Sequence, residues 1–464
     1  MKPIQLPMVD ASSNFDAIDP VDGRYYDTAI ASYLSERSRI AFQAYVEGAL
    51  AQTLADFGVC SHEIADAISE AATKVTAEAV AEEEKTTKHD VKAVVNVIKS
   101  HLNDEAKPFV HFGATSYDIV STAMALQLRT ACDELLVPRL EALQKTLLEL
   151  TDKYADTVQV GRTHGQHAVP ITFGFLMAEY AQRIGESYKS MAFLSTKLKG
   201  KFSGATGTYN ALSIFVDDPF EFEKQVLAKV GLEPSVFSKQ IVPAENIVRF
   251  LDEVNVCANV MANLSHDMRN LQRSEIAEVR EKFEEGQTGS STMAHKRNPW
   301  NFENVISMSK QVNAQLLNAQ LNIVSEHQRD LTDSASARFY GVMLALVASM
   351  AKRLNEVMSK LEVDAEQMEK NLYLSGGAIA AEPLYLLLEK YGHTQAHETS
   401  KKIAHEAQAA GRSLYEAAST DTSIADYFAK FTDSEKKILE NPEKNYTGLA
   451  AQKARQIHDF WSNQ

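Results

Sequence analysis

Long stripes of apolar residues at helical spacing constrain this chain of 464 residues more than any other feature. Three stripes advance by three and four residues in turn, which is the period of one face of an α-helix. Several such helices in succession predict a helical bundle whose core is formed by the stripes. The stripes comprise Leu136, Leu140, Leu143, Leu147 and Leu150; Val254, Ala258, Met261, Leu264, Met268 and Leu271; and Val305, Met308, Val312, Leu316, Ala319 and Ile323.

The composition agrees with a helical, globular protein. Gly (20) and Pro (12) are scarce, so few residues interrupt helices. The formal net charge of -15 disfavours a general nucleic-acid or membrane-surface binder. A small anionic substrate stays possible, because a local basic pocket can lie within an acidic surface. We therefore expect no nucleic-acid partner and no membrane partner.

The three cysteines, Cys60, Cys132 and Cys257, are odd in number and far apart. They fit neither a metal site nor a disulfide framework, which predicts reduced thiols in a reducing compartment. Residues 1–15 lack the pattern of a signal peptide, and the most apolar run, residues 339–351, is too short to span a bilayer. We expect a cytoplasmic protein in which that run is a buried helix.

The predicted fold class is all-α, with weak strand signals throughout and three regions along the chain. Residues 1–114 are predicted to form an N-terminal helical domain, which begins with an extended arm and continues as short helices. Residues 115–362 contain the long helices of a central bundle domain. Residues 363–464 are predicted to form a C-terminal domain of shorter helices.

Two predicted loops interrupt the long helices, and loops on a rigid scaffold are where chemistry tends to lie. Residues 161–170 contain His164 and His167, without a nearby acidic or cysteine ligand that would complete a metal site. Residues 284–299 contain three consecutive hydroxyl residues behind two glycines. The chain has no Walker loop, GxGxxG, HExxH or GxSxG motif.

The second loop ends in the segment GSSTMAHKRNP, residues 289–299. Asn298 is suited to cap a helix that begins at Pro299. Lys296 and Asn298 would then lie at the positive end of a helix dipole, which favours anions. A flexible polar loop before a capped helix explains the same residues without any chemistry, so local physics leaves both interpretations open.

This segment resembles the signature of the fumarase–aspartase superfamily, with Ala294 where the superfamily has proline. Five further segments resemble motifs of bacterial-type adenylosuccinate lyases, in family order. Taken singly, each has a simpler explanation: Thr115 and Asp118 form a capping box, Arg24 is a solvated charge, and His89 with Asp90 makes a structural hydrogen bond. The segments are DPVDGRY at 19–25, KTTKHDV at 85–91, FGATS at 112–116, RTHGQ at 162–166, and QRDLTDS at 328–334 with Arg338.

The resemblance implies a three-domain fumarase/aspartase-like fold and an enzyme that eliminates fumarate from adenylosuccinate and from its carboxamide ribotide analogue, SAICAR. It implies that Ser290 is the base and His164 the acid, with Lys296 holding the developing carboxylate charge. Asn298 and Gln240 resemble contacts to the substrate carboxylate and the base, and His89 lies beside the phosphate or the acid. The remaining substrate contacts that it implies are Arg24, Tyr25, Lys88, Asp90, Thr115, Ser116, Ser291, Arg297, Asn304, Arg329, Ser334, Ala335, Ser336, Ala337 and Arg338.

The resemblance also implies a homotetramer whose active sites collect residues from several subunits, and no metal or organic cofactor. Three alternatives stay open. A sister lyase, such as argininosuccinate lyase or a carboxymuconate cycloisomerase, would share the signature but not the segments at Arg24 and His89. A non-catalytic, crystallin-like relative would not need Ser290, His164 and Lys296 together. A helical interaction scaffold would explain the stripes but not the loops.

Overall fold

The computed structural model describes residues 24–283, 293 and 296–464, and helices dominate this part of the chain. The prediction of an all-α fold is confirmed. The chain divides into two compact units that interleave along the sequence. The first unit comprises residues 1–141, 186–262 and 304–353, and the second comprises residues 142–185, 263–303 and 354–464. The division into three domains stays a prediction.

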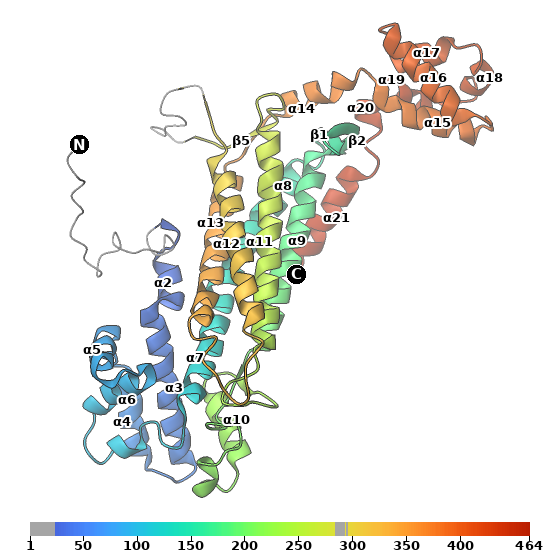
Figure 1. Cartoon of the computed structure of the whole chain (residues 1–464). Helices are drawn as coiled ribbons and strands as arrows, with labels where there is room; N and C mark the ends of the chain where they lie inside the picture. Colours follow the sequence, from blue (N-terminus) through green and yellow to red (C-terminus); the bar gives the residue numbers. More distant parts are fainter. Residues whose placement is uncertain (1–23, 284–292, 294–295) are drawn as a thin grey trace. The chain divides into compact units, whose positions relative to one another are not determined.

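Five helices begin the described part of the first unit (Figure 1), and all but α3, which has 21 residues, are short as predicted. The side chains of Asp27, Ser35, Ser61, Thr76 and His89 each accept a hydrogen bond from a backbone N–H three residues further on, which fixes where these helices start. One apolar core joins the last four of them. The helices are α2 (Thr28–Leu34), α3 (Glu36–Asp56), α4 (His62–Ala72), α5 (Ala77–Thr87) and α6 (Asp90–Ser100).

Long helices contain the three apolar stripes, as predicted. Every residue of the stripes is buried except Ile323, which is 44% exposed because it follows the end of its helix. The first stripe lies in a continuous helical run in which a π-helical turn, η3 (Cys132–Leu136), joins two helices. The helices are α7 (Ser116–Ala131), α8 (Val137–Lys153), α9 (Phe173–Ser195), α11 (Glu245–Leu271), α12 (Trp300–Leu321) and α13 (Tyr340–Met358).

Polar contacts join these helices within each unit. In the first unit, α11 and α12 exchange hydrogen bonds between the side-chain amides of Asn259 and Asn313, at 3.0 and 3.2 Å. In the second unit, the Tyr180 hydroxyl of α9 donates to the Asp267 carboxylate of α11 at 2.5 Å. Buried apolar residues form the core, and these bonds add directional contacts between neighbouring helices.

Three two-stranded sheets are present in the described part of the chain. The largest is an antiparallel hairpin of β1 (Val158–Thr163) and β2 (Gln166–Thr172), where the sequence predicted a loop at residues 161–170. The hairpin was missed because its turn is His164-Gly165 and not one of the common Asn-Gly or Asp-Gly pairs. The other sheets are β3 (Lys199–Gly200) with β4 (Glu233–Pro234), and β5 (Val279–Arg280) with β6 (Glu362–Val363).

Shorter helices complete the chain. Those after residue 364 belong to the second unit and are drawn in orange and red in Figure 1. Most of them surround a separate apolar core that includes Leu384, Ile403 and Leu414. None of the described helices combines the length and apolar character that a membrane span requires. The remaining elements are α10 (Pro219–Lys229), α14 (Ala365–Leu372), α15 (Ala381–Lys390), α16 (Ala396–Ala409), α17 (Leu414–Thr420), α18 (Ala425–Phe428), α19 (Asp433–Glu440), α20 (Pro442–Asn445) and α21 (Ala450–Ser462), with single turns η2 (Lys107–Phe109), η4 (Leu212–Ile214), η5 (Ser336–Phe339), η6 (Tyr373–Ser375) and η7 (Ala378–Ala380).

Candidate active site

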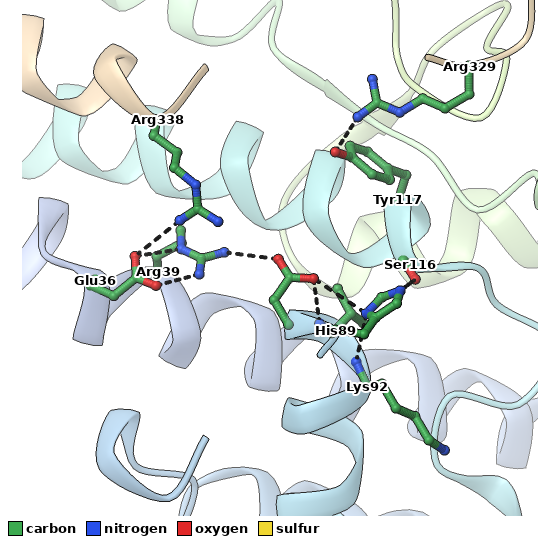
Figure 2. A network of polar contacts seen from close by, with 10 residues as sticks. Glu36, Arg39, His89, Lys92, Ser116, Tyr117, Arg329 and Arg338 are labelled. Carbon is green, nitrogen blue, oxygen red and sulfur yellow. Dashed lines mark hydrogen bonds and ion pairs between the residues drawn. The ribbon is translucent and has the colours of Figure 1, made fainter. Parts of the chain in front are cut away.

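A sharp turn between α5 and α6 places His89. Lys88 ends α5 in the left-handed conformation, with φ of 53°, and His89 caps α6. The Nδ1 atom of His89 accepts a hydrogen bond from the Lys92 backbone N–H at 3.3 Å. A neutral imidazole that accepts through Nδ1 has its proton on Nε2. The Nε2 atom lies 3.5 Å from the Ser116 hydroxyl oxygen (Figure 2).

Ser116 is the first residue of α7, and a capping box fixes its position. Thr115 and Asp118 form this box, as the sequence predicted, and the Thr115 backbone N–H donates to Asp118 Oδ2 at 2.8 Å. The capping box therefore explains Thr115 structurally. It does not use the Ser116 side chain, which is free to face His89.

A cavity of about 510 Å³ in the first unit brings together residues from four separate segments. Seven of the predicted site residues line it, which no single motif could show. A volume of this size is within the range of small-molecule pockets. The seven residues are Lys88, His89, Asp90, Ser116, Ser334, Ala337 and Arg338.

The same cavity contains charged residues that sequence reasoning missed, chiefly Glu36 and Arg39. Arg39 Nε donates to Glu36 Oε2 at 2.8 Å, and its Nη1 lies 4.0 Å from Asp90 Oδ2. Arg338 Nη1 lies 3.9 Å from the same Glu36 oxygen, Oε2 (Figure 2). The Arg39 guanidinium lowers the pKa of the Glu36 carboxyl below its usual value. No local motif surrounds Arg39, so only the fold reveals it.

Arg329 is placed differently from Arg338. Its side chain is 10% exposed, donates to Asp333 Oδ1 at 2.8 Å and to the Tyr117 hydroxyl, and lies over the Tyr117 ring at 4.0 Å. Figure 2 shows it facing Tyr117. It is absent from the cavity lining, which contains Tyr117 and Asp333 instead. Arg329 thus supports the cavity wall in this conformation.

The structure does not gather the remaining predicted residues of the first unit into this cavity. Asn304 Nδ2 donates to the Tyr25 hydroxyl at 3.4 Å, so these two residues are neighbours. The Ser336 hydroxyl donates to Asn322 Oδ1 at 2.7 Å. Arg24 and Ala335 are exposed, while Gln240 is half-buried and its backbone N–H donates to the Gln328 carbonyl at 3.2 Å.

His164 lies at the tip of the β1–β2 hairpin, in the second unit. His164 and Gly165 have φ of 55° and 74°, the two positive values that a tight hairpin turn of this type needs. His164 is exposed, so its ring is available to a substrate. Below the tip, Arg162 Nη2 lies 2.5 Å from Glu278 Oε1, and the Glu278 side chain is fully buried. This ion pair holds the hairpin in place.

Lys296, Arg297 and Asn298 line a second cavity of about 500 Å³, within the second unit. Arg269 and Arg273 line it as well, so it is rich in positive charge. This is chemistry that suits a carboxylate or phosphate. Ser290 and Ser291 lie outside the described residues.

The start of α12 corrects one expectation. The helix begins at Trp300, so Asn298 is not its capping residue. The backbone N–H groups of Asn301 and Phe302 donate to Glu281 Oε1 at 3.0 and 3.2 Å. The Glu281 carboxylate, buried at 1% exposure, therefore occupies the positive helix end that we expected to face an anion. The prediction failed because Glu281 is remote from this segment in sequence.

Among the residues that the structure describes, no group of three or more His, Cys, Asp or Glu side chains could hold a metal ion. The two cavities are lined by a histidine, hydroxyl groups and cationic side chains. These groups can transfer protons and bind an anionic substrate.

Comparison with known proteins shows the family to which the chain belongs. A sequence profile described as "Lyase" matches residues 23–314, and one described as "Adenylosuccinate lyase C-terminal" matches residues 325–432. The adenylosuccinate lyase of Pyrococcus horikoshii is 36% identical over 450 residues, which are 96% of this chain and 98% of the relative. That of Pyrococcus abyssi is 37% identical over 447 residues, 95% of this chain and 96% of the relative.

A solved structure, the 3-carboxy-cis,cis-muconate lactonizing enzyme from Pseudomonas putida, has the same fold. Its TM-score is 0.82 at 27% identity, covering 95% of this chain and 98% of the other. The fold and the matched segments define an enzyme of the fumarase/aspartase superfamily. Within that superfamily the chain belongs to the adenylosuccinate lyase family, whose members are carbon–nitrogen lyases.

Proposed function

We propose that this enzyme eliminates fumarate from adenylosuccinate, giving AMP, and from SAICAR, giving AICAR. The observation that supports this most strongly is the cavity of the first unit. It brings Lys88, His89, Ser116, Ser334 and Arg338 together from separate segments. A phosphate needs cationic and hydroxyl donors at one place, and this lining supplies both.

The proposed chemistry is a β-elimination by general acid–base catalysis. Ser290 removes the proton from carbon, and His164 protonates the leaving nitrogen. Lys296 stabilises the negative charge that develops on the adjacent carboxylate. The exposed position of His164 on a hairpin tip supports its role as the acid, because the ring can reach a bound substrate. The basic cavity around Lys296 supports the role of the cation.

The nucleotide is held by its phosphate in this proposal. Arg338 and Ser334, with Arg24 and Tyr25, form the clamp, and Asn298 and Gln240 contact the succinyl carboxylates and the base. Arg338 is supported by its half-exposed guanidinium in the cavity wall. Its neighbour Glu36 holds it loosely, at 3.9 Å, so a doubly charged phosphate can replace that contact.

We propose further that the enzyme is a cytoplasmic homotetramer whose active sites are shared between subunits. Large apolar residues on the long helices support an assembly: Val256 of α11 is 43% exposed, and Leu317 and Leu321 of α12 are 58% and 63% exposed. Three free cysteines support a reducing compartment. The net charge of -15 supports a small-molecule substrate and not a nucleic acid.

A sister lyase activity is the second candidate, since the muconate lactonizing enzyme shares the fold. The test is fumarate release from adenylosuccinate, SAICAR and argininosuccinate, followed by absorbance in parallel assays. We expect release from both nucleotides, because the proposed clamp addresses only the phosphoribosyl group and the succinylated amine. Release from argininosuccinate alone would contradict the proposal.

A further inference from the structure

A fully buried ion pair lies behind the wall of the first cavity. Lys201 is 0% exposed and Asp118 is 1% exposed, and the Lys201 ammonium donates to Asp118 Oδ1. Lys201 Nζ also donates to the Gly204 carbonyl at 3.2 Å. Burying two charges costs about as much free energy as their attraction returns, so such a pair adds little to stability. The main effect of the pair is to fix the relative positions of the two segments that it joins.

The Asp118 carboxylate connects two segments that are far apart in sequence. Its Oδ2 atom accepts from the Thr115 N–H at 2.8 Å, and its Oδ1 atom accepts from the Gly204 N–H at 3.2 Å. The first turn of α7 is thereby tied to the segment that follows β3. The Lys201 ammonium lies beside the shared carboxylate as its countercharge, and the two oxygens of Asp118 accept all of these bonds.

The backbone of this segment, residues 200–204, packs closely against α7. The Thr122 hydroxyl both donates to the Lys201 carbonyl and accepts from the Lys201 N–H, each at 3.1 Å. A Cβ atom added at Gly200 would lie 2.3 Å from Leu227 and 2.9 Å from the Thr122 hydroxyl oxygen. Gly200 is therefore needed for this approach, and Lys201 reaches Asp118 from a rigid support.

We propose that Lys201 is a positioning residue for substrate binding. It acts through Asp118 to hold the first turn of α7, and this turn presents Ser116 to His89 and the cavity. The inference depends on the proposed function at one point, which is the contact between Ser116 and the substrate. Neither Lys201 nor Asp118 lines the cavity, so their effect on binding is indirect.

The first test is kinetic. Lys201→Met keeps most of the length of the side chain and removes its charge, and we expect KM for adenylosuccinate to rise about tenfold or more while kcat falls less. Lys199→Met is the matched control. Lys199 lies two residues before Lys201, its side chain is 18% exposed, and its ammonium donates to Glu233 of β4, outside α7 and the cavity lining. An equal rise in KM in both variants, or a lower melting temperature with unchanged KM in Lys201→Met, would overturn the proposal.

Two double variants bury no charge and remove the risk that Lys201→Met fails to fold. Lys201→Met with Asp118→Asn keeps an oxygen acceptor for the Thr115 N–H, and its KM should stay within about threefold of the wild-type value. Lys201→Met with Asp118→Ala removes that acceptor, and its KM should rise about tenfold or more. Indistinguishable KM values in the two double variants would refute the role of the cap.

Hydrogen exchange supplies a measurement that does not depend on activity. In Lys201→Met, the amides of residues 112–122 should exchange about tenfold faster than in the wild type, while those of α6 should stay unchanged. Unchanged exchange at residues 112–122 would contradict the positioning role, whatever the substrate. Absence of fumarate release by the wild type, with faster exchange in the variant, would instead reject the proposed function alone.

Discussion

At the scale of single residues, Arg329 and Arg338 belong to one sequence motif but lie in different environments. Arg329 is 10% exposed and is held by Asp333 and Tyr117, whereas Arg338 is 55% exposed and lines the cavity. An arginine that is already paired and buried supports structure, while a half-exposed one beside a loose carboxylate is available to a phosphate. The sequence placed both arginines among the substrate contacts.

Arg338→Ala should therefore raise KM by about 10- to 100-fold and change kcat little. The phosphate is remote from the bond that breaks, so its binding is lost equally in the ground state and the transition state. The measurement is steady-state fumarate release over a range of adenylosuccinate concentrations. Arg37→Ala is the control, because Arg37 is 65% exposed on the same helix as Glu36 and is not part of the cavity. A collapse of kcat at unchanged KM would show that Arg338 is catalytic or structural.

His111 gives a prediction on pH. Burial alone would lower its pKa, but the charge of Glu47 and a 2.6 Å hydrogen bond to it outweigh that effect and raise the pKa above its ordinary value of 6.5. A pKa that is higher in the folded state than its ordinary value of 6.5 contributes to the stability of the protein. This contribution is fully present below pH 6.5 and is lost as the pH rises through the folded-state pKa.

The stability advantage of the wild type over Glu47→Gln should accordingly be larger at about pH 6 than at about pH 9. Melting temperatures of both proteins across this range test the expectation. An advantage that is constant with pH, or grows toward about pH 9, would show that Glu47 does not raise the pKa of His111 in the folded protein.

At the scale of elements, the β1–β2 hairpin depends on one buried carboxylate. Glu278 accepts from Arg162, from Gln159 Nε2 at 2.7 Å and from Asn371 Nδ2 at 2.8 Å. It thereby joins the base of the hairpin to α14. Removing one partner from such a network leaves the others buried without compensation, which typically costs about 3–5 kcal/mol.

Glu278→Ala should lower the melting temperature by several degrees and reduce kcat, because the hairpin that presents His164 loses its anchor. Glu275→Ala is the control, since Glu275 is 70% exposed and its contact with Arg273 is 3.6 Å long. Thermal unfolding and fumarate release are measured on both variants. A Glu278→Ala protein with the thermal stability and kcat of the wild type would contradict the anchoring role.

At this scale, some features could be predicted from the sequence and others could not. The long helices were predictable because a helical apolar period is a local property of the sequence, and the capping box of Thr115 and Asp118 is equally local. The hairpin turn of His164 and Gly165, the Glu281 contact to α12 and the place of Arg39 in the cavity were not predicted. The hairpin was missed because His-Gly is not one of the common turn pairs. The other two features depend on residues that folding brings together, which no local pattern encodes.

At the scale of the whole molecule, the proposed sharing of active sites between subunits has a direct test. His164→Ala and Ser290→Ala should each be nearly inactive as homotetramers. If one site takes His164 and Ser290 from different subunits, co-refolding equal amounts should restore about a quarter of the sites. Each mutant refolded alone is the control for exchange and refolding. Confirmed subunit exchange without recovered activity would rule out sharing of these two residues, although both could still be catalytic.

The identity of the products tests the central claim most directly. Adenylosuccinate is incubated with the purified enzyme, and the nucleotide and the organic acid are quantified by chromatography and mass spectrometry. Elimination by the proposed acid and base breaks the bond between the amine nitrogen and the succinyl carbon, so AMP and fumarate should form in equal amounts. Formation of IMP and aspartate, or no fumarate at all, would contradict the assignment.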